Sequence, residues 1–111
     1  MKVENLFSVD KKTVLITGGS RGIGEMIASG FCANGAKVYI TARSGNVVKE
    51  TAKNLSEKYN CKCIGIESDI SSIEGIKSLS NMVKNEENSL DVLINNAGAA
   101  WGAPVENFPE V

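Results

Sequence analysis

The sequence contains 111 residues, of which 42% are hydrophobic and 23% are charged. This length suits one globular domain, so we expect a single domain over residues 1–111. The 12 Lys and Arg side chains are balanced by 13 Asp and Glu side chains, so no positive excess indicates a nucleic-acid partner. The sequence has no histidine, which excludes Ser-His-Asp and Cys-His catalysis and zinc sites that need imidazole.

The sequence predicts a cytoplasmic protein that does not enter a membrane. The first 12 residues lack the apolar stretch of a signal peptide, and no run of about 18 apolar residues predicts a membrane span. The cysteines Cys32, Cys61 and Cys63 are odd in number, which favours free thiols. Cys61 and Cys63 could instead form a metal or redox pair, but no second pair of ligands accompanies them. We expect no bound metal.

The first predicted strand covers residues 13–17 and ends at a cluster of glycines. A helix follows, because apolar residues recur there with helical spacing, and Gly35 stands where a helix C-terminal glycine belongs. The apolar stripe of this helix consists of Ile23, Met26, Ile27 and Phe31.

The second and third predicted strands cover residues 37–42 and 62–66, and a helix lies between them. The apolar stripe of that helix consists of Val48, Ala52, Leu55 and Tyr59. A third helix follows, with Ser71 as predicted N-cap and Glu74 completing a capping box. Its stripe consists of Ile73, Ile76, Leu79 and Val83. A fourth strand is predicted over residues 90–95.

This alternation predicts an open, parallel α/β sheet of about four strands in the order β-α-β-α-β-α-β. Strands joined by helical crossovers are parallel, and the helices then cover both faces of the sheet. We therefore expect the strands to be buried on both faces and the helical stripes to form the core.

A glycine-rich segment, T-G-G-S-R-G-I-G, links the first strand to the first helix. Gly18 would allow the tight turn, Gly22 the close approach of a phosphate to the backbone, and Gly24 close packing of the helix. The N–H groups at the helix N-terminus would supply donors and a favourable dipole, and Ser20 and Arg21 could reach phosphate oxygens. The spacing differs from G-x-G-x-x-G, and a glycine turn without a ligand is the alternative.

Three motifs together resemble the short-chain dehydrogenase/reductase family. They are T-G-x-x-x-G-x-G after the first strand, Asp69-Ile70 after the third, and N-N-A-G at residues 95–98 after the fourth. Ligands bind at these carboxyl ends of strands in open α/β sheets. The resemblance implies a Rossmann-like fold and an oxidoreductase that interconverts carbonyl and alcohol groups with a nicotinamide dinucleotide.

The resemblance also implies individual roles. Asp69 would accept a hydrogen bond from the adenine amino group, and the backbone of Ile70 would contact the ring. Asn95 would hold the fourth strand in place, and Thr17 would brace the glycine turn, while residues 96–98 would pass close to the riboses. Asp69 alone could equally be an acid at a helix start. The candidate cofactor-binding residues are Thr17, Gly18, Ser20, Arg21, Gly22, Ile23, Gly24, Arg43, Ser44, Asp69, Ile70, Asn95, Asn96, Ala97 and Gly98.

The end of the second strand indicates which cofactor is bound. A protein that prefers NAD usually places Asp or Glu there, whereas this sequence reads Thr-Ala-Arg-Ser. The guanidinium of Arg43 can pair with a 2′-phosphate, and Arg21 and Ser44 could add a charge and a hydroxyl. We therefore expect NADP(H) to be preferred over NAD(H). A solvated loop arginine is the alternative for Arg43.

No catalytic residue is predicted. The family uses a Tyr-x-x-x-Lys pair for proton transfer, and neither Tyr39 nor Tyr59 begins this motif. We therefore expect a truncated form of the fold, with an exposed fourth strand and no turnover unless a missing half binds the substrate. Trp101 could line a substrate pocket or pack internally. The string around it is similar to a subset of the family that includes rhamnolipid-type 3-oxoacyl-thioester reductases, which does not fix a substrate.

Two other functions stay open. The chain could be a non-catalytic nucleotide-binding module, or a remnant that binds nothing. Full-length relatives in this family are usually homo-oligomers, so the resemblance also implies self-association.

Overall fold

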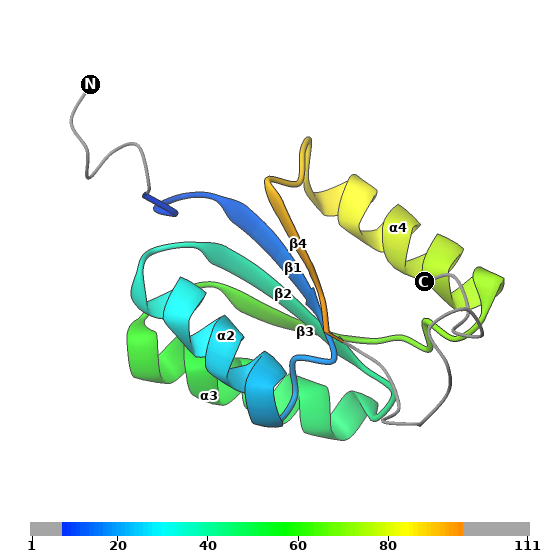
Figure 1. Ribbon diagram of the computed structural model, residues 1–111, viewed down its shortest axis with the longest axis horizontal. Coiled ribbons are helices and arrows are strands. Elements are labelled where there is room, and N and C mark those ends of the chain that lie inside the picture. The colour runs from blue at the N-terminus through cyan, green and yellow to red at the C-terminus, as the bar shows by residue number, and fades with distance from the viewer. Residues whose placement is uncertain (1–7, 97–111) are drawn as a thin grey trace, which may run out of the picture.

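The computed structural model describes residues 8–96 and confirms the predicted alternation of strands and helices (Figure 1). The elements in chain order are β1 (Thr13–Thr17), α2 (Gly22–Ala33), β2 (Lys37–Ala42), α3 (Gly45–Tyr59), β3 (Cys63–Glu67), α4 (Ile73–Glu86) and β4 (Val92–Asn95). The first two strands match the predicted bounds, whereas β3 is shifted by one residue and β4 begins two residues late. Among the described helices, none is both long and apolar enough to cross a bilayer.

The four strands form one parallel sheet in the order β3-β2-β1-β4. Helices α2 and α3 lie on one face and α4 lies on the other, which gives the expected Rossmann-like α/β arrangement (Figure 1). In this register Thr17 lies opposite both Thr41 and Asn95. The carboxyl ends of the three neighbouring strands therefore meet at one edge of the sheet.

Each face of the sheet has its own apolar core. Val14, Ile16, Val38 and Ile40 pack with residues of α2 and α3. Alternate residues of the same strands, Leu15 and Tyr39, pack instead with Leu79 and Val83 of α4. Successive side chains of a strand point to opposite faces, so one apolar run can supply both cores.

The prediction that the strands are buried on both faces is confirmed for β1 and β2 but is wrong for β4. Every residue of β1 is buried, whereas β4 alternates between half-buried and exposed residues. Leu93 is 60% exposed because β4 lies at the end of the strand order and pairs only with β1 among the described strands. The expected exposure of the fourth strand is confirmed for the described residues.

The predicted stripes of α2 and α4 are also partly wrong. Ile23 and Met26 are 69% and 72% exposed, because α2 turns its small residues Gly24, Ala28 and Cys32 to the sheet. Small residues allow the helix to approach the strands closely. In α4, the first-turn residues Ile73 and Ile76 are exposed, and only Leu79 and Val83 are buried. The predicted stripe of α3 is confirmed at Val48, Ala52 and Leu55.

The helix ends give one confirmation and one correction. Gly35 follows the end of α2 with φ +86°, as expected for a C-terminal glycine. The N-cap of α4 is Ser72, whose Oγ accepts from the backbone N–H of Gly75 at 3.0 Å, so the predicted capping box from Ser71 is wrong. Ser71 instead donates to Asp69, which begins the turn before the helix.

A polar cluster ties the end of α4 to the amino ends of β1 and β2. The carboxylate of Glu87 forms an ion pair with Lys37 and accepts from the Tyr39 hydroxyl at 2.6 Å and from Thr13 Oγ1 at 3.3 Å. The Lys37 and Tyr39 hydrogen bonds lower the pKa of Glu87. The neighbouring Asp91 accepts from the Thr13 N–H at 2.9 Å, which starts the pairing of β4 with β1.

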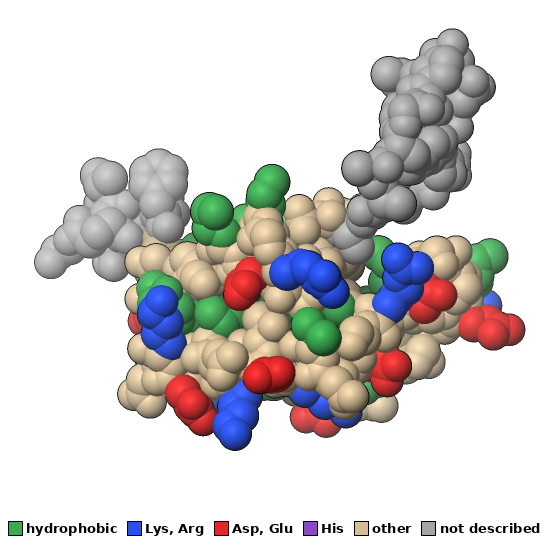
Figure 2. Space-filling view, turned by 90° about the horizontal axis from the view of Figure 1, so that it is seen from below, with side chains coloured by type: hydrophobic (Ala, Val, Ile, Leu, Met, Phe, Trp, Pro, Cys, Tyr) green, Lys and Arg blue, Asp and Glu red, His purple; other side chains and the backbone are tan. Residues whose placement is uncertain are grey.

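Charged side chains of both signs are interspersed over the face that carries α2 and α3, with apolar side chains between them (Figure 2). No large surface of one sign is visible on this face, in agreement with the balanced composition.

Candidate functional site

The glycine turn after β1 is held to β2 through a single carbonyl group. The N–H groups of Gly18 and Gly19 both donate to the carbonyl oxygen of Thr41, at 2.9 and 3.1 Å. Gly18 has φ +70°, which favours glycine and allows the chain to leave the strand sharply. These two N–H groups serve the protein itself, so phosphate donors must come from the following residues.

The donors that remain lie in the first turn of α2. The first backbone hydrogen bond of this helix runs from the Glu25 N–H to the Arg21 carbonyl. The N–H groups of Gly22, Ile23 and Gly24 come before it in the chain and therefore take no part in the hydrogen bonds of the helix. Gly22 has φ +62°, and a Cβ there would meet no atom within 4 Å. The backbone at Gly22 is therefore unobstructed.

Gly24 is required by close packing. A Cβ at this position would lie 2.2 Å from the Gly18 carbonyl oxygen and 2.7 Å from the Asn96 amide nitrogen. The expected close packing is thus present, but α2 packs here against the glycine turn and the end of β4. Because a methyl group cannot fit, glycine at position 24 sets the distance between the helix N-terminus and the turn.

Thr17 joins the ends of β1 and β4. Its hydroxyl lies 3.1 Å from Asn95 Oδ1 and accepts from the Asn96 N–H at 3.0 Å. The side-chain amide of Asn96 then donates to the Gly18 carbonyl at 3.2 Å. Thr17 and Asn96 therefore brace the glycine turn together, and Asn95 holds the end of the fourth strand in place.

Ser20, Arg21 and Ile23 surround the open backbone at Gly22. The Ser20 carbonyl accepts from Thr51 Oγ1 of α3 at 3.1 Å, which fixes the middle of the loop. Arg21 is the exposed N-cap of α2 and forms no side-chain cap hydrogen bond. Ile23 is exposed in the same turn. The Arg21 guanidinium can thus add positive charge next to the positive end of the α2 dipole.

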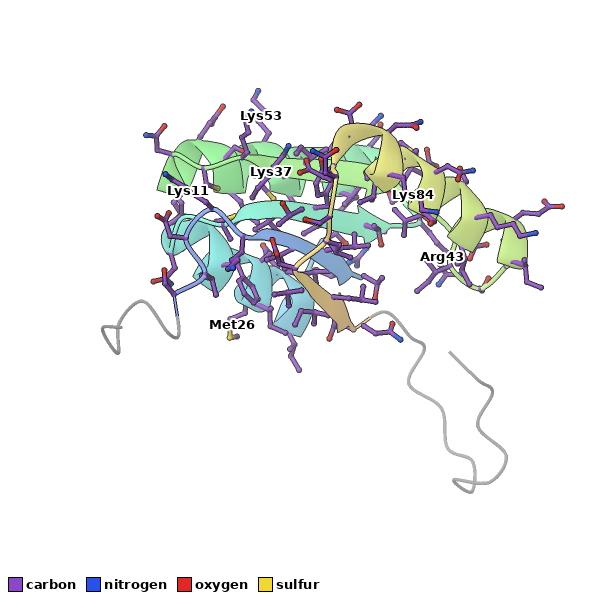
Figure 3. All side chains as sticks on the ribbon, turned by 90° about the horizontal axis from the view of Figure 1, so that it is seen from above. Lys11, Met26, Lys37, Arg43, Lys53 and Lys84 are labelled. Carbon is purple, nitrogen blue, oxygen red and sulfur yellow. The ribbon has the colours of Figure 1, made fainter. Side chains whose placement is uncertain are left out.

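A second group of candidate residues lies at the ends of β2 and β3. Arg43 is exposed, and its charge contributes to lowering the pKa of Asp69, after the larger contributions of the Ser71 side-chain and backbone hydrogen bonds. Arg43 lies at the end of the sheet that faces away from Lys11 (Figure 3). Ser44 is the N-cap of α3 and accepts from the Val47 N–H at 3.5 Å, a structural role that the sequence reading missed.

Asp69 has a local structural role as well. Its Oδ1 accepts from the N–H of Ser71 at 3.0 Å and from the Ser71 hydroxyl at 2.5 Å, forming the turn that leads into α4. The side chain of Ile70 packs against the core on the α4 face. Ala97, Gly98 and Trp101 lie outside the described residues.

Two contributors to this site were missed at the sequence level. A Cβ at Gly19 would lie 2.5 Å from Ile40 Cγ2, so this glycine is as necessary as its neighbours. The Gly-Gly pair after the strand was the available signal. Thr51 lies 31 residues from the loop that it contacts, and nothing in its local sequence indicates that contact.

The geometry suits a dinucleotide. At one end of the candidate site, the open backbone at Gly22, the N-terminus of α2 and the Arg21 side chain lie together, which suits a diphosphate. At the other end, the exposed Arg43 follows β2. Among residues 8–96, no group of three or more acidic, histidine or cysteine side chains could hold a metal ion. The site therefore offers main-chain donors and guanidinium groups to an anion.

Comparison with known proteins agrees with this geometry. A family model described as short chain dehydrogenase matches residues 12–111. The chain is 43% identical over 103 residues to the rhamnolipids biosynthesis 3-oxoacyl-(acyl-carrier-protein) reductase of Pseudomonas aeruginosa, covering 93% of this chain and 40% of that protein. It is 38% identical over 95 residues to the NADP-dependent 3-hydroxy acid dehydrogenase of Schizosaccharomyces pombe, covering 85% and 37%.

Solved structures give the same result. The Pseudomonas aeruginosa RhlG/NADP active-site complex matches with a TM-score of 0.81 and 43% identity, over 94% of this chain and 40% of that one. The L-sorbose reductase of Gluconobacter frateurii, complexed with NADPH and L-sorbose, matches with a TM-score of 0.82 and 30% identity, over 93% and 39%. The chain thus spans about 40% of the length of these relatives.

Proposed function

The chain belongs to the short-chain dehydrogenase family, and from this premise we propose that it binds NADP(H) as the cofactor-binding part of a carbonyl/alcohol oxidoreductase. The observation that carries the proposal is the open first turn of α2. Its N–H groups precede the first helical hydrogen bond, and the backbone at Gly22 is unobstructed. These donors would hold the diphosphate.

The preference for NADP(H) rests on Arg43. Its guanidinium is exposed at the end of β2, close enough to Asp69 for its charge to contribute to the lowered pKa of that carboxylate. In this arrangement Arg43 would pair with the 2′-phosphate while Asp69 would face the adenine. The Ser44 hydroxyl already caps α3, so we give it a smaller share of the phosphate contact. Two proteins with similar folds are complexes with NADP or NADPH, which supports this choice.

Bound NADPH would supply the hydride, and this chain's own residues would hold and orient the dinucleotide. Residues 95–98 would lie along the ribose and nicotinamide side, and the Asn96 amide holds the glycine turn through its hydrogen bond to the Gly18 carbonyl. We assign the proton donor to none of the 111 residues, because the sequence contains no Tyr-x-x-x-Lys. Turnover, the carbonyl or alcohol substrate, self-association and a cytoplasmic location are parts of the proposal that concern the whole protein.

Cofactor titration of the full chain tests the proposal. We expect saturable binding of NADPH, measured by nucleotide fluorescence, and weaker binding of NADH. Arg43→Ala should weaken NADPH binding about tenfold or more, since a charged phosphate pair contributes on the order of 1.4 kcal/mol or more, and leave NADH binding nearly unchanged. Lys84→Ala, which removes a cation from the last turn of α4, is the matched control and should change neither affinity.

The possible outcomes separate the alternatives. Equal losses of NADH and NADPH affinity in Arg43→Ala would contradict the 2′-phosphate contact but not nucleotide binding. Binding with no carbonyl reduction by the chain is the expected result, because the chain has no Tyr-x-x-x-Lys. Carbonyl reduction by the chain would contradict the assignment of the proton donor to none of its residues. Folded protein that binds neither nucleotide would overturn the proposed function.

A further inference from the structure

A hollow of about 520 Å³ lies at the end of the sheet opposite the glycine turn. Its walls come from the end of α2, the end of α3 and the start of β2, and three lysines line it: Lys11, Lys37 and Lys62. Figure 3 shows Lys11 and Lys37 toward this end of the sheet, away from Arg43. Lys37 is paired with Glu87, whereas Lys11 and Lys62 are exposed. The exposed Lys11 and Lys62 thus bring positive charge to the hollow, while the Asp10 carboxylate lies beside Gly35 in its wall.

Three thiols lie close to one another at this end of the sheet, and two of them, Cys32 and Cys61, line the hollow. Cys32 is buried in the last turn of α2, Cys61 is half-buried before β3, and Cys63 is the buried first residue of β3. Cys32 and Cys63 belong to one buried core cluster, and Cys61 packs against it. Residues about 30 positions apart in sequence thus place their thiol side chains in one cluster. Within residues 8–96 these thiols do not form a group that could hold a metal.

The three cysteines differ in access. Cys32 and Cys61 both line the hollow, but only Cys61 is more than marginally exposed. Its Sγ also lies 3.7 Å from the Leu55 carbonyl oxygen, which holds the side chain beside the end of α3. An oxidant in the hollow would reach Cys61 first, and Cys32, which lines the same hollow, would then be the thiol that is placed to resolve the product.

We propose that Cys61 and Cys32 form an intramolecular disulfide by exchange with a small anionic disulfide that enters this hollow. The Cys61 thiolate attacks one sulfur of the incoming disulfide, whose S–S bond breaks and releases one thiolate. The Cys32 sulfur, after losing its proton to solvent, attacks Cys61 Sγ in the mixed disulfide and expels the second thiolate. Two protein thiols are oxidised, and one small disulfide is reduced to two thiols.

The exchange is slow at neutral pH and accelerates in alkali. Burial and the Cys32 hydrogen bond raise the pKa of Cys61 to about 12, and the Cys63 hydrogen bond and burial raise the pKa of Cys32 as well. Little thiolate of either cysteine is therefore present at pH 7. The other titratable groups around the hollow are its three lysines, Asp10 beside Gly35, Tyr59, Cys32 and Cys63. Below that pKa, each pH unit should increase the exchange rate about tenfold, because the thiolate fraction increases by that factor.

The test is incubation of the full chain with glutathione disulfide, followed by mass spectrometry and peptide mapping. Wild type should lose two hydrogens and give one cross-linked peptide containing Cys32 and Cys61. Cys32→Ala should instead accumulate one glutathionyl group on Cys61, and Cys61→Ala should give neither product. Cys63→Ala, the neighbouring control, should behave like wild type, since Cys63 takes no part in the exchange.

Charge recognition is tested separately from thiol chemistry. Lys11→Gln with Lys62→Gln should slow the reaction with glutathione disulfide severalfold and leave that with the neutral hydroxyethyl disulfide unchanged. Equal slowing with both reagents would overturn the proposed anion preference. A cross-link between Cys32 and Cys63, or no cross-link at pH 9 in protein whose circular dichroism shows it folded, would overturn the disulfide itself.

Discussion

The side-chain amide of Asn96 donates to the carbonyl oxygen of Gly18 at 3.2 Å, and both atoms lie within 3 Å of where a Cβ of residue 24 would stand. This contact joins the end of β4, the turn after β1 and the first turn of α2. The shape of the candidate phosphate site therefore depends on a hydrogen bond between residues 78 positions apart and on the absence of a side chain at Gly24.

Gly24→Ala should disrupt this junction. The new Cβ would lie 2.2 Å from the Gly18 oxygen, so either α2 or the turn must move. Overpacking of this kind costs about 1–3 kcal/mol, and we expect a loss of stability in that range together with weaker NADPH binding. Urea denaturation and nucleotide titration measure the two effects.

Gly30→Ala provides the matched control in the same helix. A Cβ at Gly30 would meet nothing within 4 Å, so alanine should stabilise the chain by roughly 0.5–1 kcal/mol through its better helix propensity. NADPH affinity should not change. Equal effects of alanine at positions 24 and 30 would show that close packing at Gly24 is unimportant.

Thr17→Val should loosen the end of β4 from β1. Valine keeps the shape of the buried side chain but removes the hydroxyl that accepts from the Asn96 N–H at 3.0 Å. A loss of about 1–2 kcal/mol is expected, because the polar partners lose their hydrogen bond. Hydrogen exchange of the Asn96 amide should be faster in Thr17→Val than in the wild type. Thr17→Ser retains the hydroxyl and should leave the exchange rate unchanged. An unchanged exchange rate in Thr17→Val would contradict the bracing role.

Glu87→Gln should reduce stability by removing the charge that pairs with Lys37. Charged hydrogen bonds contribute roughly 1.5–3 kcal/mol when buried and less when partly exposed, so a loss near 1 kcal/mol is expected. Glu86→Gln changes the preceding, exposed glutamate and should have little effect. Chemical denaturation at pH 7 compares the two variants.

The same pair predicts how stability depends on pH. The pKa of Glu87 is lowered, chiefly by the Lys37 hydrogen bond. The contribution of Glu87 to the free energy of unfolding is therefore present above the ordinary glutamate pKa and is lost as pH falls through the lowered value. The pKa of Lys37 is raised by the same hydrogen bond, so its contribution persists at neutral pH and is lost in strong alkali. Glu87→Gln should flatten the acid limb of the stability profile; an unchanged limb would contradict the assignment.

Ser71→Ala should raise the pKa of Asp69. The Ser71 hydroxyl hydrogen bond is the largest cause of its lowered pKa, and the charge of Arg43 is a smaller one. NMR titration of the Asp69 carboxyl should therefore show a larger upward shift in Ser71→Ala than in Arg43→Ala. The reverse order would place Arg43 in closer contact with Asp69 than the structure shows.

The strands could be predicted from the sequence because their apolar runs are short and end at glycine or polar residues. The helical faces were harder to predict. In α2, the stripe of large residues suggested a core face, but the helix turns Gly24, Ala28 and Cys32 inward, and small residues carry no hydrophobic signal. The position of a helix relative to a sheet depends on how closely the backbones approach, which local sequence does not encode.

The candidate site was predictable to a similar degree. Its glycines and the Asn-Asn pair follow strands, and parallel strands bring those positions together at one edge. The contacts of Thr41 with the turn and of Glu87 with Lys37 and Tyr39 were not predicted, because each joins residues far apart in sequence. Ser72, and not Ser71, is the N-cap of α4, because the Ser71 hydroxyl is hydrogen bonded to Asp69 in the preceding turn.

The pairing of β1 with β4 also constrains biosynthesis. Ribosomes deliver residue 17 well before residue 95, and the intervening helices and strands can begin to fold in that interval. The glycine turn nevertheless lacks its hydrogen bond from Asn96 until that residue has left the exit tunnel and β4 has aligned with β1. Nascent chains arrested before that point should be collapsed yet unable to retain dinucleotide, so the proposed competence for the cofactor would require synthesis to pass β4.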